Sequence, residues 1–242
     1  AVESLEAAEL VKLANNSYRD LSFAFANQIG LLAESVNIDA FDLISKANAG
    51  YPRNKIPLPS PGVGGYCLTK DPYLLENSIS PDFRVPIHSL GRQINDEAAL
   101  IAIGKLEKHA TRIKKPLSDF SVLVVGIAFK GLPETNDLRG SCAIDLINEL
   151  ASRSVTVSVW DAIVSEEDLS AIGLDVVSNL ESVDRDFDAV LVMNNHPENR
   201  RIETVLMNCK DCLIFDGWHT LDKELIKSAD NFVYSTIGFM EE

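Results

Sequence analysis

A cysteine stands in a loop that is otherwise rich in glycine and proline. The segment Ser60–Tyr73 reads SPGVGGYCLTKDPY, and its glycines allow sharp turns that expose backbone N–H groups. A thiol becomes nucleophilic where a cation or a helix N-terminus favours its thiolate. Lys70 offers a charge near Cys67, and Asp71-Pro72 is typical of a helix start, with the aspartate as cap. The residues alone leave two interpretations open: a catalytic nucleophile, or a buried thiol in a tight loop.

The other metal-binding and redox-active side chains form no pattern that predicts a site. Cys209-x-x-Cys212 is a single pair, whereas a structural zinc site needs four ligands. The pair precedes a predicted strand instead of opening a helix, so it does not fit a redox motif either. Cys142 falls in an apolar helical pattern, and we expect all three to be buried thiols. No metal site is predicted, because the histidines lack ligand spacing: His88, His109, His196 and His219.

A possible dinucleotide site follows the first predicted strand. This strand ends in GIAFKG, with Gly126 and Gly131 separated by four residues. The G-x-G-x-x-G fingerprint needs two glycines one residue apart, so that a pyrophosphate can approach the backbone. Asp161 ends the second strand, where a ribose-binding acid would stand. Without the glycines, Asp161 is better interpreted as a strand-end or capping residue, and we do not expect this domain to bind NAD in the usual way.

The first half of the chain has the apolar spacing of helices. Residues 5–36 predict one long helix or two nearly continuous ones, and Asp39 is placed to cap a short helix over residues 40–46. A loop with four prolines occupies residues 50–70. A second long helical pattern covers residues 86–114. Long helices on both sides of one irregular loop predict an all-helical domain.

The second half alternates strands and helices. After a linker at residues 114–119, strands are predicted at FSVLVVGIAF, VTVSVW, DAVLVM and CLIFDG, with helices at 141–152 and 221–228. This alternation predicts a parallel, doubly wound α/β sheet. The expected organisation is an all-helical domain (residues 1–115), which the family resemblance described below makes a central, dimerisation domain, followed by a Rossmann-like domain (residues 116–242).

Composition excludes several classes of protein. The 242 residues are 46% hydrophobic and 24% charged, as in ordinary globular proteins, and four cysteines do not suggest a disulfide framework. The net charge of −14 argues against nucleic acid, which needs a basic patch. No apolar run reaches the roughly 18 residues of a membrane span, and the acidic N-terminus has no signal-peptide pattern. We therefore expect a cytoplasmic protein.

Several motifs, in order, resemble one enzyme family. VGGYCLTKDPY closely resembles the catalytic cysteine loop of the UDP-glucose/GDP-mannose dehydrogenase family, whose members oxidise a nucleotide sugar twice to its uronic acid. EAAELVKLANNSYRDLSFAFANQIG resembles the start of the family's central helix, GRQIND its second long helix, and VGIAFKGLPETNDLRGSCAIDL and IFDGWHTLD its C-terminal domain. Family members begin with an NAD-binding domain that has no counterpart here. The resemblance implies a fragment that is inactive alone because its hydride-acceptor site is absent.

The resemblance also implies catalytic roles. Cys67 would trap the intermediate aldehyde as a thiohemiacetal, which a second oxidation converts to a thioester that water hydrolyses. Lys12 and Asn16 match the family's oxyanion-stabilising pair, and their i, i+4 spacing places them on one helix face. Asp71 would position the water or the catalytic lysine.

Binding roles are implied in the same way. Gly64 would pass close to the nucleotide sugar, and Lys130 would contact it. Arg53 would reach the substrate of a neighbouring subunit in a homodimer formed by the helical domain, whose long first helix is amphipathic. Arg139 would contact NAD, although the stretch between Lys130 and Arg139 is two residues longer here than in the better-known members of the family. Trp218 stands where many members carry a substrate-binding arginine.

Two functions from different classes follow. The leading prediction is an NAD-dependent nucleotide-sugar 6-dehydrogenase, with YPRNKIPLPSPGVGG closer to enzymes for UDP-N-acetylhexosamines than to those for UDP-glucose. The alternative is a non-catalytic module that binds a nucleotide sugar and dimerises. A weaker third reading, a thiol-redox protein, would require Cys209 and Cys212 to be accessible.

Overall fold

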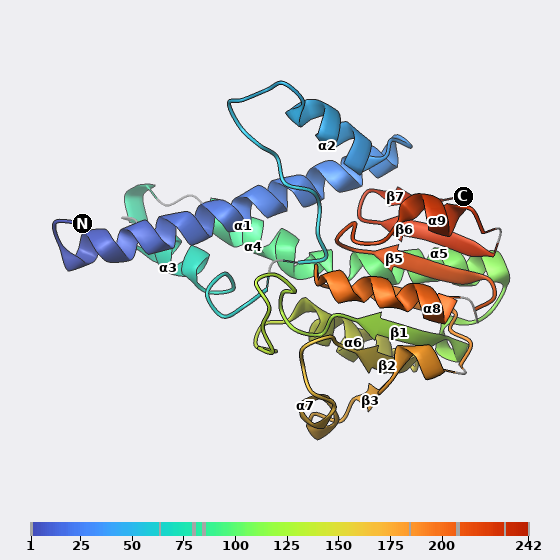
Figure 1. The fold of residues 1–242 in the computed structure, drawn as a ribbon. Helices are drawn as coiled ribbons and strands as arrows, with labels where there is room; N and C mark the ends of the chain where they lie inside the picture. Colours follow the sequence, from blue (N-terminus) through green and yellow to red (C-terminus); the bar gives the residue numbers. More distant parts are fainter. Residues whose placement is uncertain are drawn as a thin grey trace.

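The computed structural model describes residues 2–62, 64–78, 81–83, 86–183, 185–206, 209–229 and 231–241. A long helix, α1, extends away from a twisted sheet, and several of the shorter helices of the first half lie along it (Figure 1). Among the described residues, no helix is both long enough and apolar enough to cross a bilayer.

The first half of the chain is helical, as the apolar spacing predicts. α1 (Leu5–Ser35) is one continuous helix. It is capped by Ser4, whose hydroxyl accepts a hydrogen bond from the N–H of Ala7 at 3.1 Å. Asp39 caps α2 (Ala40–Asn48) as expected. The helices that pack against α1 include α3 (Asp71–Asn77) and α4 (Ile87–Ala98), and a short 3₁₀ turn occupies Pro81–Phe83.

The predicted single helix over residues 86–114 is in fact two helices. α4 ends at Ala98, and α5 (Ile101–Ile113) starts after a turn at residues 99 and 100. The two halves have different packing partners, because α4 lies on α1 whereas Ala102 and Leu106 of α5 are buried in the core of the sheet. The division expected at residues 115 and 116 stays a prediction, with α5 contributing to the core of the second half.

The second half forms a seven-stranded sheet in the order β3-β2-β1-β4-β5-β6-β7, and all neighbouring pairs are parallel except β6 with β7. The strands are β1 (Ser121–Val125), β2 (Thr156–Trp160), β3 (Asp175–Val176), β4 (Ala189–Val192), β5 (Cys212–Asp216), β6 (Phe232–Thr236) and β7 (Phe239–Met240). The helices between them are α6 (Cys142–Ser152), α7 (Glu166–Ala171), α8 (Glu203–Leu206) and α9 (Lys223–Lys227), with 3₁₀ turns at Leu117–Asp119, Leu180–Ser182 and Pro197–Ile202.

Both faces of the sheet are buried, which explains the near-continuous apolar strands. Val122 and Val124 of β1 belong to the core on the side of α5 and α6. Leu123 and Val125 belong to the core on the other side, with residues of α8 and α9. The predicted α/β class, with a helical part followed by a doubly wound sheet, is confirmed.

Candidate active site

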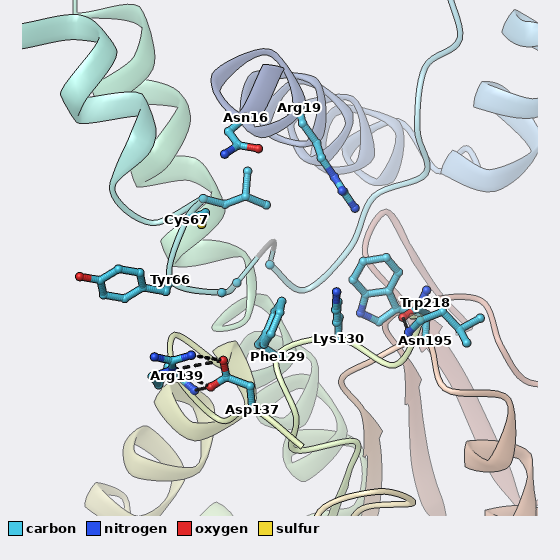
Figure 2. Close-up of a pocket in the computed structure, with 15 residues that line it drawn as sticks. Asn16, Arg19, Tyr66, Cys67, Phe129, Lys130, Asp137, Arg139, Asn195 and Trp218 are labelled. Atoms are coloured by element: carbon cyan, nitrogen blue, oxygen red, sulfur yellow. Dashed lines mark hydrogen bonds and ion pairs between the residues drawn. The ribbon is translucent and has the colours of Figure 1, made fainter. Parts of the chain in front are cut away.

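A pocket of about 390 Å³ lies where α1 and the cysteine loop meet the carboxyl ends of the strands. Ligands of doubly wound sheets commonly bind outside this edge. Figure 2 shows Asn16 and Arg19 reaching the pocket from α1, Cys67 and Tyr66 from the loop, and Lys130 from the segment after β1. The remaining lining residues are Gly62, Gly64, Gly65, Leu68, Phe129, Leu132, Asp137, Arg139, Asn195 and Trp218.

The carboxylate of Asp71 contacts three polar side chains beside the cysteine loop. Its Oδ2 atom accepts a hydrogen bond from Nδ2 of Asn16 at 2.7 Å and lies 3.4 Å from Nζ of Lys12. Its Oδ1 atom accepts a hydrogen bond from Nζ of Lys70 at 2.8 Å. The structure therefore brings together four residues that the sequence singled out, with Lys12 and Asn16 converging on one carboxylate oxygen.

The prediction that Asp71 caps a helix is wrong. Asp71 is the first residue of α3, its neighbour Lys70 holds the cap position, and that cap makes no side-chain hydrogen bond. The carboxylate instead faces α1 because its partners there are cationic and amide groups. Burial raises the pKa of Asp71, but hydrogen bonds from Lys70, Asn16 and Lys12 outweigh burial and leave the pKa below its ordinary value.

Cys67 lies in a tight turn that leads into α3. The carbonyl of Cys67 accepts hydrogen bonds from the N–H groups of Lys70 and Asp71 at 3.3 and 2.9 Å. The thiol-bearing residue is exposed, so the buried-thiol interpretation of Cys67 is wrong.

Two of the other three cysteines are buried, as the sequence predicts, whereas Cys142 is only partly buried. Cys209 and Cys212 are buried, which removes the thiol-redox reading. Burial raises the pKa of the Cys142 thiol to about 12. No cluster of three or more His, Cys, Asp or Glu in the described ranges is placed to hold a metal ion.

Two glycines let the cysteine turn rest directly on the segment after β1. The N–H of Gly65 donates to the carbonyl of Gly140 at 3.1 Å. A Cβ on Gly64 would lie 2.1 Å from that carbonyl oxygen, and one on Gly65 would lie 2.7 Å from the ring of Phe129. Gly65 also has φ of +92°, a backbone conformation that L side chains rarely adopt. Gly64 lines the pocket, but the atom that leaves no space for a side chain there is the carbonyl oxygen of Gly140.

Two cations of the pocket are available to an anionic ligand. Lys130 and Arg19 form no ion pair with any residue that the structure describes, and each lies over an aromatic ring, Phe129 at 5.2 Å and Phe23 at 6.0 Å. Figure 2 shows Arg19 directed from α1 toward Trp218 and the side of the pocket that carries Lys130.

Arg139 is already paired within its own loop. Its Nε and Nη2 atoms donate to the carboxylate of Asp137 at distances down to 2.7 Å, and its guanidinium lies 5.8 Å from the ring of Tyr66. The hydrogen bonds from Arg139 lower the pKa of Asp137 to about 2. Arg139 lines the pocket, while its contact with NAD stays a prediction.

Arg53 and Trp218 lie at different places relative to the pocket, and the expected contact of Arg53 with a neighbouring subunit's substrate stays a prediction. Arg53 is exposed on the loop after α2 and does not line the pocket. Trp218 does line it, but its indole N–H donates to the carbonyl of Met193 at 2.9 Å. Trp218 therefore contributes an apolar ring to the pocket wall, and Arg19 provides a guanidinium from α1.

The turn after β1 does not fit a dinucleotide. In a dinucleotide-binding turn the backbone N–H groups face the pyrophosphate. Here the N–H groups of Ile127 and Ala128 donate to Oδ2 of Asp161 at 2.6 and 2.9 Å. A Cβ on Gly126 would lie 2.6 Å from the side chain of Asn194, so that space is filled as well. Asp161 is a structural residue of the strand ends, as predicted.

Two residues that line the pocket, Arg19 and Asn195, were not predicted from the sequence. Arg19 follows Asn16 by three positions and Lys12 by seven, so the helical spacing that paired the first two could have revealed it. Asn195 lines the pocket and accepts hydrogen bonds from the N–H groups of Gly131 and Leu132. No local pattern marks it, because its partners are about 60 residues away.

The fold and site define an α/β protein with a small-molecule pocket between a helical layer and the carboxyl edge of a doubly wound sheet. Residues 6–97 match the model of the UDP-glucose/GDP-mannose dehydrogenase family, central domain, and residues 123–223 match the UDP binding domain of the same family. The chain belongs to the UDP-glucose/GDP-mannose dehydrogenase family.

Relatives and solved structures agree with this assignment. UDP-N-acetyl-D-mannosamine dehydrogenase from Pyrococcus horikoshii is 31% identical over 234 residues, which are 96% of this chain and 51% of that protein. Its solved structure superposes with a TM-score of 0.81 at 30% identity, covering 96% of this chain and 52% of that one. NDP-N-acetyl-D-galactosaminuronic acid dehydrogenase from Methanosarcina mazei Go1 gives 0.82 at 26% identity, covering 98% and 52%. The chain thus spans about half the length of these relatives.

Proposed function

We propose that this chain is the central and nucleotide-sugar-binding part of an NAD-dependent dehydrogenase that oxidises the C6 alcohol of a UDP-sugar to the uronic acid. The observation that carries the proposal is the exposed Cys67 on the wall of a pocket, with Lys12, Asn16 and Asp71 gathered beside it. UDP-N-acetylhexosamines are the favoured substrate class, because several similar proteins are named UDP-N-acetyl-D-mannosamine dehydrogenase.

Cys67 would act as the nucleophile. The C6 alcohol would first lose a hydride and a proton to become the aldehyde. The Cys67 thiolate then attacks the carbonyl carbon of this aldehyde, a C–S bond forms, and the carbonyl oxygen takes a proton to give a thiohemiacetal. Loss of a hydride and a proton leaves a thioester. Water then adds to the carbonyl carbon, the C–S bond breaks, and the acid and the free thiol are released. NAD would accept both hydrides, and residues outside the turn after β1 would hold it.

Lys12 and Asn16 would stabilise the negative charge that develops on the C6 oxygen. An ammonium and an amide N–H₂ on one helix face are suitable donors for such an oxyanion. Asp71 holds both donors on the side of the cysteine loop. Because its pKa is below the ordinary value, Asp71 is a weak proton acceptor, and we assign it to positioning rather than to general-base catalysis.

Lys130 and Arg19 would bind the anionic part of the substrate. Both line the pocket and have no carboxylate partner among the described residues. A diphosphate between them would be neutralised without breaking an existing ion pair. Trp218 would form the apolar wall next to this group, since its N–H is already bonded.

A second copy of the chain would cover the exposed apolar side of α1. Leu10, Phe25, Leu32 and Val36 are each about half exposed or more, which is unusual for one helix of a monomer. A homodimer through the helical part would bury them and would bring Arg53 of one protomer toward its partner. Light scattering tests this arrangement, and a clean monomer at micromolar concentration would refute it.

The test of the activity uses the full-length protein with UDP-N-acetyl-D-mannosamine and NAD. We expect two NADH for each uronic acid detected by mass spectrometry. Cys67→Ala should form no acid, whereas Cys142→Ala, which removes a thiol behind the pocket wall, should keep the activity. Acid formation at the normal rate by Cys67→Ala would overturn the nucleophile assignment. Tight binding of nucleotide sugars without any NADH would favour the binding module instead.

A further inference from the structure

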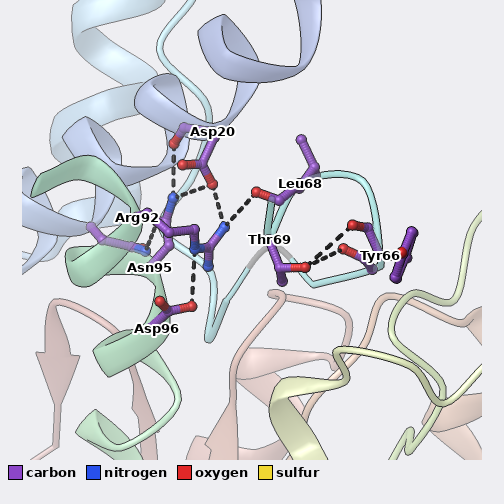
Figure 3. Close-up of polar contacts among 9 residues, drawn as sticks. Asp20, Tyr66, Leu68, Thr69, Arg92, Asn95 and Asp96 are labelled. Atoms are coloured by element: carbon purple, nitrogen blue, oxygen red, sulfur yellow. Dashed lines mark hydrogen bonds and ion pairs between the residues drawn. The ribbon is translucent and has the colours of Figure 1, made fainter. Parts of the chain in front are cut away.

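A buried polar network lies against the cysteine turn on the side of the helices. At its centre Arg92 of α4 meets Asp20 of α1, with side-chain exposures of only 3% and 0%. Figure 3 shows this pair between the two helices, with Leu68 of the cysteine turn on one side and Asn95 and Asp96 nearby. None of these groups takes part in the chemistry described above.

Arg92 joins both helices to the cysteine turn. One guanidinium nitrogen, Nη1, donates to Oδ1 of Asp20 and also to the carbonyl of Leu68 at 3.4 Å. Nε donates to Oδ1 of Asp96 at 2.9 Å. Leu68 directly follows Cys67, so the guanidinium contacts the backbone one residue from the thiol.

A second branch of the network reaches the start of the same loop. Asn95 donates to both the carbonyl and Oδ1 of Asp20, at 2.8 and 2.9 Å. Its own Oδ1 accepts from Nδ2 of Asn27 at 3.2 Å, and Oδ1 of Asn27 accepts from the N–H of Ser60 at 2.9 Å. The network therefore holds the loop at two places, Ser60 and Leu68.

A purely stabilising role does not explain this arrangement well. Desolvating two charges is expensive, and apolar side chains of similar volume commonly stabilise a core as well as a buried ion pair does. The cysteine loop, in contrast, has a clear need for outside support. Gly62, Gly64 and Gly65 have no side chains with which to fix it, and glycine leaves the backbone many alternative conformations.

We propose that Arg92 is a positioning residue for Cys67: its guanidinium, oriented by Asp20, fixes the turn through the carbonyl of Leu68. The effect on catalysis rests on the proposed function, whereas the effect on the turn does not. A loosened turn would displace the thiol from the C6 carbon while Lys130 and Arg19 still bind the substrate. Loss of Arg92 should therefore lower kcat and leave KM nearly unchanged.

The test measures amide hydrogen exchange of the peptide covering residues 64–71 in this chain. Arg92→Lys keeps the charge, but one ammonium cannot serve Asp20, Asp96 and Leu68 together. The double variant Arg92→Met with Asp20→Leu removes both charges and should keep the thermal stability. Asp96→Asn is the matched control, because it removes only a partner that is 55% exposed.

We expect both Arg92 variants to exchange this peptide about tenfold faster or more, with α5 unchanged and the control like the wild type. In the full-length protein, kcat should fall about tenfold with KM within about twofold. If the peptide exchanges in the double variant as in Asp96→Asn, the proposal is overturned, whether or not Arg92→Lys folds. Faster exchange in a protein that oxidises no nucleotide sugar would support the positioning role and count against the proposed function alone.

Discussion

Gly64→Ala should separate the cysteine turn from the sheet. The added Cβ would lie 2.1 Å from the carbonyl oxygen of Gly140, whereas ordinary contacts are 3.4–4 Å. Both groups belong to the backbone, so neither can rotate away, and the two segments must part by more than 1 Å. That movement breaks the hydrogen bond from Gly65 to Gly140, which is 3.1 Å long.

The expected cost follows from these two effects. A net hydrogen bond contributes about 1 kcal/mol, and forcing a methyl group into a packed site costs about 1–3 kcal/mol. The free energy of unfolding should therefore fall by about 2–4 kcal/mol, which for a protein of this size lowers Tm by about 5–15 °C. The displaced Cys67 should also lower kcat in the full-length protein.

Gly104→Ala is the matched control. Gly104 lies in α5 with no atom within 4 Å of an added Cβ, so alanine should stabilise the helix by about 0.5–1 kcal/mol. Calorimetry or thermal circular dichroism on both variants gives the comparison. If Gly64→Ala melts at the wild-type temperature, the close approach of the cysteine turn to Gly140 is refuted.

Two further predictions concern the ionisable groups. Iodoacetamide should label Cys67 in the native chain and spare Cys142, Cys209 and Cys212, because Cys67 is exposed and burial raises the pKa of Cys142 to about 12; peptide mapping that finds a second thiol labelled as fast would contradict this. The free energy of unfolding should fall as the pH drops from about 4 toward 2. Asp71 and Asp137 have pKa values in the folded chain that lie below those in the unfolded chain. The stability that they contribute is therefore present above the unfolded pKa and is lost as the pH falls through the folded pKa. Denaturant titrations across this range check it, with a smaller loss expected in Asp137→Asn, and a rise in stability toward pH 2 would be the opposite result.

Local signals in the sequence predicted the elements well. Asp39 caps its helix, the apolar stretches form the strands, and Asp161 is a structural residue at the strand ends, as its position predicted. Capping, apolar periodicity and glycine spacing act within a few residues, so they can be identified without knowing the fold. The break between α4 and α5 was not predicted, because each half is apolar at helical spacing and only their different packing partners separate them.

Contacts between distant segments required the structure. Asp71 has the sequence signal of a helix cap, but α1 packs beside α3 and supplies Lys12 and Asn16, so the carboxylate binds them instead. Arg92 is part of a recognisable motif, yet nothing near it in the chain indicates that it contacts the carbonyl of Leu68.

The sequence by itself determined the helices and strands, the family and the cysteine motif, because these depend on residue type and short-range spacing. The tertiary structure decided which side chains surround Cys67, which carboxylate holds Lys12 and Asn16 together, and why Gly64 has no space for a side chain. The physical reason is that these contacts join segments 50 to 80 residues apart, and their partners are set by how α1, α4 and the sheet pack around the cysteine loop.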